Sequence, residues 1–569
     1  MTTYVHCPDR PQTLEPAWIE ARYRGLLERA AEADRSPTPD GWLALYEDWN
    51  ALKSYLGSEG SRRRHAYSRA MDDPAKEEAE RVYREELNPK AEDGESALVA
   101  ALLQSPHKEA IGARYGPSSC ACSRCSRSPR PAQRRVPGRS REPGHRIRQA
   151  RGPGRGRGPG RDPDPGSRPG QAHLFGPGPA PAAFEAYYGW FVDNRELLAD
   201  VYHRQVQVRD RMGKTLGHPT FVPLGYAGMG RTDYGPEEAA RFRAAVQAHA
   251  SPLFRALCEE QAQALGTPTL RPWDREYHPG RTLPVDVAEP VEEQLDKAGR
   301  VFERLSPKLA AHFSRMREQG LIDLENRKAK RAGAYCTSFP DENKVAIFCN
   351  SVGSEGDVGT LTHEMGHAFQ GWESQWIDAV DLRWPTSDAC EVHSMGMEYL
   401  SLPYLDEFFT PEQQARFTHS RWKRGVELLC YVSVVDAFQH WVYEHPQATP
   451  DERDQTWVRL QDTFLPGIDW SGEAERYRAS RWYAQLHIFR YPFYYIDYAI
   501  AETGAMQLGM LDTQDHEGCL ATYLELCRLG GTGSVLQLFQ GAGLRSPFDP
   551  DGMRDLMAHA ADVLGLPTA

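Results

Sequence analysis

The residues best suited to chemistry stand in a five-residue run, HEMGH, from His363 to His367. On a helix, two histidines four positions apart lie one above the other, so both imidazoles can reach one tetrahedral zinc ion. Glu364 then stands beside the open position of the metal, where it can act as a general base. The spacing suits a zinc hydrolase, and the alternative interpretation is an amphipathic helix with two satisfied histidines.

The segment that holds these side chains, from Asp357 to Gly371, is predicted to be a helix. Asp357 can cap its first amides, and Gly371 can close its end. Between them, four apolar residues recur at helical spacing: Val358, Leu361, Met365 and Phe369. The HEMGH run therefore lies within a helix that has a buried face.

A catalytic zinc site needs a third protein ligand, and a second predicted helix, which begins at Ser387, offers Glu391. Glu391, Ser394 and Glu398 form one polar stripe among apolar neighbours, which indicates a buried helix. A buried carboxylate needs a partner, so we expect Glu391 to bind the metal, with a solvated acidic face as the alternative. Asp388 can be either a hydrogen-bond partner of a ligating histidine or a cap of this helix.

Two short strands are predicted just before the zinc helix, in the segment GAYCTSFPDENKVAIFCN. They flank a Pro-Asp-Glu-Asn turn, and the alternation after the turn predicts one buried face. An exposed strand edge can hold an extended peptide through main-chain hydrogen bonds, so we expect substrate to bind along Ala346 and Phe348. A purely structural hairpin is the alternative.

Polar aromatic residues are concentrated between Arg481 and Thr503. Pro492 should interrupt a helix there and restart it at Phe493. Buried hydroxyls and imidazoles need partners, so a water-filled catalytic cleft explains this composition better than an apolar core does. We expect four side chains to face that cleft, with Tyr491 and Tyr495 binding substrate: His487, Tyr491, Tyr495 and Tyr498.

Composition limits the class of protein. A length of 569 residues predicts two or three packed subdomains. No apolar run approaches a membrane span, and the first residues lack the features of a signal peptide, so we expect a cytoplasmic protein without a membrane partner. Its 11 cysteines are then expected to be reduced. The net charge of -12 argues against general nucleic-acid binding.

Residues 118–182 differ from the rest of the chain, because Arg, Pro and Gly dominate and lysine is absent. Such a segment cannot bury enough apolar surface to offset its ordering entropy, so it is predicted to be disordered. We hypothesise that it is an out-of-frame translation between two compensating frameshifts, since helical periodicity stops and restarts abruptly at its ends. The alternative is a segment that contacts nucleic acid through its Arg and Gly residues.

Several stretches together resemble a known family. HEMGHAFQ followed by EVHSMGME, with GAYCTSFP before and HIFRYPFYYIDYA after, resembles the oligoendopeptidase F branch of the thimet oligopeptidase superfamily of zinc metallopeptidases. The resemblance extends from about Ala183 onward. It implies His363, His367 and Glu391 as ligands of one Zn²⁺ per chain, and Glu364 as the general base. It also implies that His487 and Tyr498 contact the substrate or the transition state.

The expected fold is mainly α, with two helical lobes around a deep substrate channel and a small β-sheet beside the zinc helix; the channel is implied by the resemblance. We expect an N-terminal helical region (1–117), the Arg/Pro/Gly segment (118–182), a helical lobe (183–300) and a zinc-binding catalytic domain (301–569). The expected function is a metalloendopeptidase that hydrolyses oligopeptides. A zinc carboxypeptidase of related helical architecture is the alternative within the same class.

Overall fold

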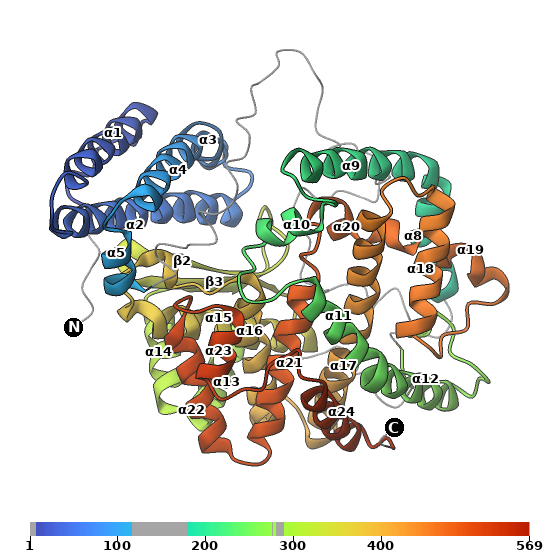
Figure 1. Cartoon of the computed structure of the whole chain (residues 1–569). Helices are drawn as coiled ribbons and strands as arrows, with labels where there is room; N and C mark the ends of the chain where they lie inside the picture. Colours follow the sequence, from blue (N-terminus) through green and yellow to red (C-terminus); the bar gives the residue numbers. More distant parts are fainter. Residues whose placement is uncertain (1–6, 117–179, 276, 280–289, 568–569) are drawn as a thin grey trace.

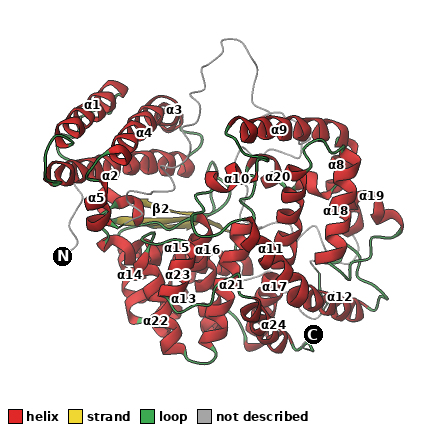
Figure 2. Cartoon of the chain, in the orientation of Figure 1, coloured by secondary structure: helices red, strands yellow, loops and turns green. Residues whose placement is uncertain are grey.

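The structure is a computed structural model that describes residues 7–116, 180–275, 277–279 and 290–567. Helices make up most of these residues, and the strands among them form one small sheet (Figures 1 and 2). The expected mainly α fold with a small β element is therefore confirmed. None of the described helices is long and apolar enough to cross a membrane.

Residues 7–116 form a helical region of their own. Its α-helices are α1 (Pro16–Ala33), α2 (Asp40–Arg69), α3 (Pro74–Val82), α4 (Asn88–Gln104) and α5 (Lys108–Tyr115). Trp42 and Trp49 of α2 are buried in the core of this region. The same hydrophobic cluster includes Ile377 and Leu382, which follow the zinc helix in sequence. This region therefore packs against the catalytic part of the chain.

A second group of helices follows the segment that the structure does not describe. It consists of α8 (Ala180–Asp193), α9 (Arg195–Thr215), α10 (Val222–Gly228), α11 (Pro236–Ala245) and α12 (Ser251–Leu265). In Figure 1, α9 lies on the opposite side of the view from α1 and α4. The predicted disordered segment, 118–182, lies outside the described residues except for its last three positions, where α8 begins. The domain boundaries and the frameshift hypothesis remain predictions.

The remaining helices share the largest hydrophobic cluster with the second group. They are α13 (Val291–Leu305), α14 (Pro307–Glu318), α15 (Glu355–Glu373), α16 (Ser387–Ser401), α17 (Pro411–Glu444), α18 (Pro450–Phe464), α19 (Glu475–Arg478), α20 (Leu486–Arg490), α21 (Ile496–Asp512), α22 (His516–Leu529), α23 (Val535–Gly541) and α24 (Pro550–Leu564). Helices α15 and α16 are the two predicted around the zinc ligands, and both are largely buried.

The sheet contains one strand more than the sequence predicted. Its strands are β1 (Ile322–Glu325), β2 (Tyr335–Phe339) and β3 (Lys344–Ser351), in the order β1-β3-β2. β2 and β3 form the predicted antiparallel hairpin, whose turn ends at Asn343 in a left-handed conformation with φ 47°. Asparagine tolerates this conformation better than most residues do. β1 pairs in parallel with β3 on its other side.

This topology corrects the expected substrate contacts at Ala346 and Phe348. Both residues lie in the central strand, are fully buried, and pair with Thr337 and Tyr335 of β2. On the opposite side of β3, the amide of Ile347 donates to the carbonyl of Leu321 at 2.9 Å. A peptide cannot add to a strand with neighbours on both sides, so the prediction of an open edge at Ala346 and Phe348 is wrong.

Candidate metal centre

The helix that carries HEMGH begins at a capping box. Ser354 is the cap residue, and the side chain of Asp357 accepts a hydrogen bond from its amide at 2.7 Å. Asp357 therefore helps to start the helix, as expected, although the cap position itself belongs to Ser354. The helix continues past Gly371 to Glu373. A Cβ at Gly371 would lie 3.0 Å from the side chain of Val345, so this glycine lets α15 pack closely on β3.

A second glycine lies between the two zinc histidines and sets the distance between the helices. A Cβ at Gly366 would lie only 2.5 Å from the carbonyl oxygen of His393 and 2.6 Å from the Cα of Ser394. Any other residue would push α16 away from α15, because real Cβ contacts are longer than this. The HEMGH glycine therefore brings the helix of Glu391 within reach of both histidines.

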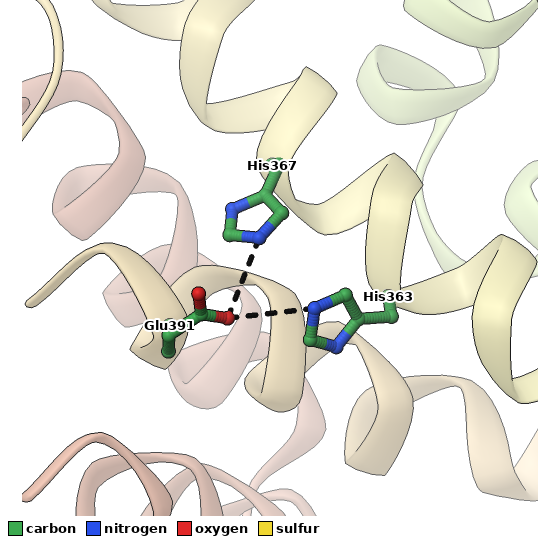
Figure 3. A group of neighbouring side chains, drawn as sticks. All are labelled: His363, His367 and Glu391. Carbon is green, nitrogen blue, oxygen red and sulfur yellow. Dashed lines mark ion pairs between the residues drawn. The ribbon is translucent and has the colours of Figure 1, made fainter. Parts of the chain in front are cut away.

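The three predicted ligands meet at one point (Figure 3). Oε2 of Glu391 lies 3.4 Å from Nε2 of His363 and 3.4 Å from Nε2 of His367. Ligand atoms of the three residues all lie within 4.8 Å of one another, and they are the one such group found among the described residues. Two imidazoles and a carboxylate are the donor set of a catalytic zinc site with an open position, so these residues fit the metal that the motif implies.

The electrostatics of the group also suit a cation. Although burial alone would lower the pKa of His363, its hydrogen bonds to Glu391 and Glu398 raise that pKa well above the usual value. Burial would raise the pKa of Glu391, but His367 and His363 hold that pKa well below the usual value. The pocket therefore favours positive charge beside an ionised carboxylate. Zinc and protons compete for the ring nitrogens of these histidines, so metal binding must release protons.

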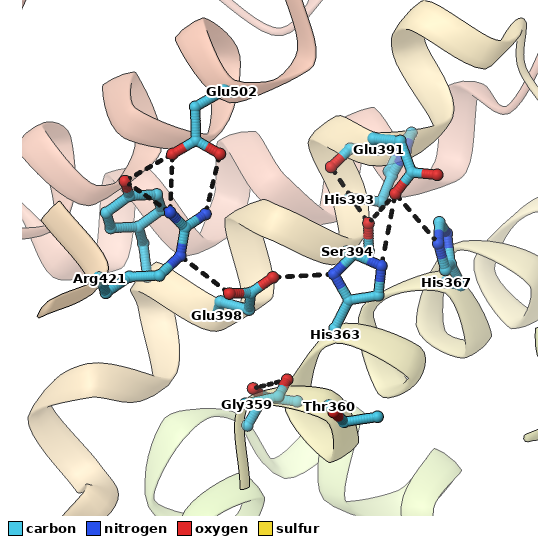
Figure 4. A network of polar contacts seen from close by, with 12 residues as sticks. Gly359, Thr360, His363, His367, Glu391, His393, Ser394, Glu398, Arg421 and Glu502 are labelled. Carbon is cyan, nitrogen blue, oxygen red and sulfur yellow. Dashed lines mark hydrogen bonds and ion pairs between the residues drawn. The ribbon is translucent and has the colours of Figure 1, made fainter. Parts of the chain in front are cut away.

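Each histidine ligand has a different partner at its second ring nitrogen, and Figure 4 shows the partner of His363. Nδ1 of His363 lies 2.8 Å from Oε1 of Glu398. Nδ1 of His367 lies 3.6 Å from the sulfur of Cys390. These contacts leave Nε2 of both rings toward Glu391, where the metal would bind. Ser394 completes the predicted polar stripe by donating to Oε2 of Glu391 at 2.8 Å.

The expected role of Asp388 as a histidine partner is wrong. Its carboxylate accepts a hydrogen bond from the hydroxyl of Tyr234 at 3.1 Å, and burial raises its pKa despite the nearby Arg231. The cap position of α16 belongs to Thr386, so Asp388 lies in the first turn. The carboxylate that supports a ligand is instead Glu398, seven residues after Glu391.

The aromatic residues predicted around His487 do gather together. The ring of His487 lies 5.0 Å from that of Tyr495 and 6.1 Å from those of Tyr491 and Tyr498. Tyr491 is 51% exposed, whereas Tyr495 and Tyr498 are buried. Tyr498 lies one helical turn before Glu502, whose carboxylate accepts a hydrogen bond from Tyr399 of α16. Residues four apart share a helix face, so Tyr498 lies on the side of α21 that packs toward the second zinc helix.

The helix is interrupted around Pro492, as predicted, but the position at which the next helix begins was predicted wrongly. α20 ends at Arg490, and α21 begins at Ile496 instead of Phe493. Phe493 adopts φ 63°, a left-handed conformation that is strained for an aromatic residue. Its amide donates to Oε1 of Gln439 at 3.1 Å, and its ring occupies the space that a side chain at Gly225 would need. Packing with distant segments thus fixes this irregular turn.

Fold and site together define the class of protein: a mainly helical zinc metallopeptidase of the HExxH type. Residues 181–558 match the family described as Peptidase family M3, and the chain belongs to that family.

Solved structures agree over nearly the whole chain. A protein described as an oligoendopeptidase F is 27% identical, with a TM-score of 0.82 and coverage of 98% of both chains. PZ peptidase A, solved with an inhibitor, gives the same identity, TM-score and coverage. A protein described as an oligoendopeptidase F from Bacillus anthracis is 27% identical, with a TM-score of 0.78 and coverage of 98% of this chain and 97% of the other. None of the curated proteins matches the chain. The resemblance inferred from the motifs is confirmed.

Sequence reasoning missed three residues behind the zinc site: Glu398 as a partner of His363, and Arg421 and Glu502 beyond it. Glu398 was visible as part of the polar stripe, but its contact depends on how the two helices cross. Glu502 did carry a signal, because it is an isolated charge in the apolar run AIAETGAMQLGM. A lone charge in a buried helix requires a partner.

Proposed function

We propose that the chain cleaves internal bonds of oligopeptides with one zinc ion per chain, held by His363, His367 and Glu391. The observation that carries this proposal is the convergence of these three side chains from two helices, within 4.8 Å and beside Glu364. Zinc supplies a Lewis acid that polarises the scissile carbonyl and makes water a better nucleophile at neutral pH. The rest of the chemistry falls to the side chains of the chain.

Glu364 serves as the general base. It is buried and stands next to His363 on α15. Its carboxylate takes one proton from the attacking water and delivers it to the amine nitrogen as the carbon–nitrogen bond breaks. The second proton of the water stays on the new carboxyl group and passes to the amine, so the products leave as a carboxylate and an ammonium group, and Glu364 returns to its ionised form.

Tyr498 and His487 donate hydrogen bonds to the carbonyl oxygen while it gains negative charge. Nδ1 of His487 accepts a hydrogen bond from Gln485 at 2.7 Å, which leaves Nε2 as the nitrogen that can carry a proton. Gln485 is fixed in turn by the hydroxyl of Tyr431 at 3.0 Å. Tyr491, which is exposed, contacts the substrate beside them, and the buried Tyr495 packs against the ring of His487.

The substrate backbone binds along the outer edge of β2. β2 is an edge strand of the described sheet and contacts α15. The main-chain N–H and C=O groups of Tyr335 and Thr337 point toward β3. Because these groups alternate in direction along a strand, those of Cys336 point away from the sheet. Burial and the nearby carboxylate of Glu364 raise the pKa of the Cys336 thiol, which is consistent with this edge running beside the general base. Main-chain pairing of this kind holds peptides with little regard to side chains.

Cleavage mapping tests this proposal. Peptides blocked at both ends should be cut at internal bonds, and zinc analysis should give one equivalent per chain. N-methylation of alternate peptide amides should raise KM only at the amides that face β2. Release of single C-terminal residues from unblocked peptides, without cutting of blocked ones, would instead favour the carboxypeptidase.

A further inference from the structure

A buried charged network lies directly behind the metal centre (Figure 4). Oε1 of Glu398 faces Nδ1 of His363, and Oε2 of Glu398 lies 2.8 Å from Nε of Arg421. The other side of the Arg421 guanidinium forms a bidentate pair with Glu502, at 2.7 Å and 3.0 Å. One arginine thus joins two carboxylates, and one of them contacts a zinc ligand.

Tyr399 closes the far end of the network. Its hydroxyl donates to Glu502 at 2.7 Å and accepts from Arg421 at 3.0 Å. The guanidinium carbon of Arg421 also lies 4.0 Å from the centre of the Tyr399 ring. Arg421, Tyr399 and Glu502 are almost fully buried, so water does not screen these contacts.

Glycines make room for this arrangement. A Cβ at Gly425 of α17 would lie 2.6 Å from Oε1 of Glu502 and 2.7 Å from the hydroxyl of Tyr399. A Cβ at Gly509 of α21 would lie 2.9 Å from the ring of Tyr399. Two helices therefore lack side chains at the points where the network passes between them.

Stability alone is a poor explanation for such a network. Buried ion pairs are often no more stabilising than apolar residues of the same volume, because desolvation of the charges offsets their attraction. In this protein, the buried charged network contacts a zinc ligand, His363, at one end. Arg421 holds Glu398 in place, since a carboxylate with a fixed cation 2.8 Å from one oxygen keeps the other oxygen aimed at its partner.

We propose that Arg421, with Glu502 and Tyr399 behind it, is a positioning residue for the zinc site. It fixes Glu398 as the acceptor for the Nδ1 proton of His363, and thereby presents Nε2 to the metal in one orientation. The contribution differs from that of a ligand, because none of the three residues contacts the metal position. This inference rests on the zinc site of the proposed function and adds residues on two further helices to it.

The test measures zinc affinity of the full chain by competition with a chromophoric chelator, together with the visible spectrum after cobalt substitution. The double variant Arg421→Met/Glu502→Gln removes one charge of each sign and leaves Glu398 in place. We expect its zinc affinity to fall by about 10–100-fold and its cobalt spectrum to shift, as is typical when the support of a ligand is lost. Arg421→Lys keeps the charge but loses the forked guanidinium group. Its zinc affinity should therefore lie between those of the double variant and the wild type.

A matched control exists in the same long helix. Arg243 of α11 forms an ion pair with the fully buried Asp436 of α17. Arg243→Met/Asp436→Asn removes a comparable buried pair, so it should lower the melting temperature while zinc affinity and the cobalt spectrum stay at wild-type values. Equal loss of zinc affinity in this control would overturn the proposal, because the effect would then be one of general stability.

Glu398→Gln covers the case in which the Arg421 variant does not fold. It keeps the shape of the side chain and the Arg421–Glu502 pair, and it should lower zinc affinity by about 10–100-fold. Wild-type zinc affinity and spectrum in Glu398→Gln or in the double variant would overturn the positioning role alone. A wild-type chain that binds no zinc would overturn the proposed function as well.

Discussion

The zinc helices and the aromatic cluster around His487 hold their polar side chains in different ways. The zinc ligands stand on two long, regular helices, and His363 is supported by a charged partner at 2.8 Å. His487 stands on a helix of five residues that is followed by an irregular turn, and its partner is the neutral amide of Gln485. Charged partners hold more strongly than neutral ones.

This difference indicates two tasks. The metal ligands are already aimed at one point, so little reorganisation is needed when zinc binds. The aromatic cluster has one strongly exposed member, Tyr491, next to buried Tyr495 and Tyr498. It is therefore suited to contact a substrate at one end and to stay anchored in the core at the other. Variants in the two regions should fail in different measurements.

The largest effect is expected from Glu391→Ala, because it removes a ligand of the metal. Zinc affinity should fall by more than the roughly 100-fold typical of outer partners, and peptidase activity should disappear with the metal. Zinc analysis after dialysis measures this. Ser394→Ala, which removes the hydrogen bonds of this hydroxyl to the carboxylate of Glu391 at 2.8 Å and to its carbonyl at 3.2 Å, is the control and should stay loaded. A zinc-loaded Glu391→Ala chain would show that another residue is the ligand.

Glu364→Gln should separate chemistry from metal binding within the zinc helices. The amide cannot take a proton, so kcat should fall by about 10²–10⁴ while zinc content stays unchanged. Single-turnover cleavage of a fluorescent peptide measures this, with Glu373→Gln near the end of the same helix as the control. Glu373 pairs with His312 and Lys308, so its variant should keep its turnover number. A near-normal kcat in Glu364→Gln would show that Glu364 is not the general base.

The same contrast explains what could be predicted from sequence. The zinc ligands follow from spacing along two helices, since residues four apart always share a face. Ala346 does not lie at an open strand edge because β1 pairs with β3. β1 lies more than twenty residues upstream, and its pairing leaves no signal in the local sequence. The restart of α21 depends on Phe493, whose backbone is fixed by Gln439 and by space beside Gly225. Long-range packing decided each feature that the sequence did not reveal.

Tyr498→Phe should impair the catalytic role of the aromatic cluster without changing metal binding. Loss of one donor to a developing oxyanion costs about 10²–10³ in kcat, and KM and zinc content should stay close to wild type. Steady-state kinetics on a blocked peptide measures both constants. Tyr494→Phe is the matched control, because its ring lies 5.3 Å from that of Tyr498 but it has no assigned role in catalysis. A rise in KM with unchanged kcat would make Tyr498 a binding residue.

The smallest effect is expected at the second histidine ligand. Cys390 offers only a sulfur atom, a weak hydrogen-bonding group, to Nδ1 of His367, 3.6 Å away, whereas His363 has the carboxylate of Glu398 at 2.8 Å. A typical hydrogen bond contributes about 1 kcal/mol net, and this long contact to sulfur should contribute no more, so Cys390→Ala should weaken zinc binding by less than about 10-fold. Chelator competition measures this, with Cys349→Ala as a control for the loss of a buried thiol. A loss in Cys390→Ala as large as that in Glu398→Gln would mean that the two ligands are supported equally. The contrast between a close carboxylate partner and a distant sulfur partner would then not decide how firmly the metal is held.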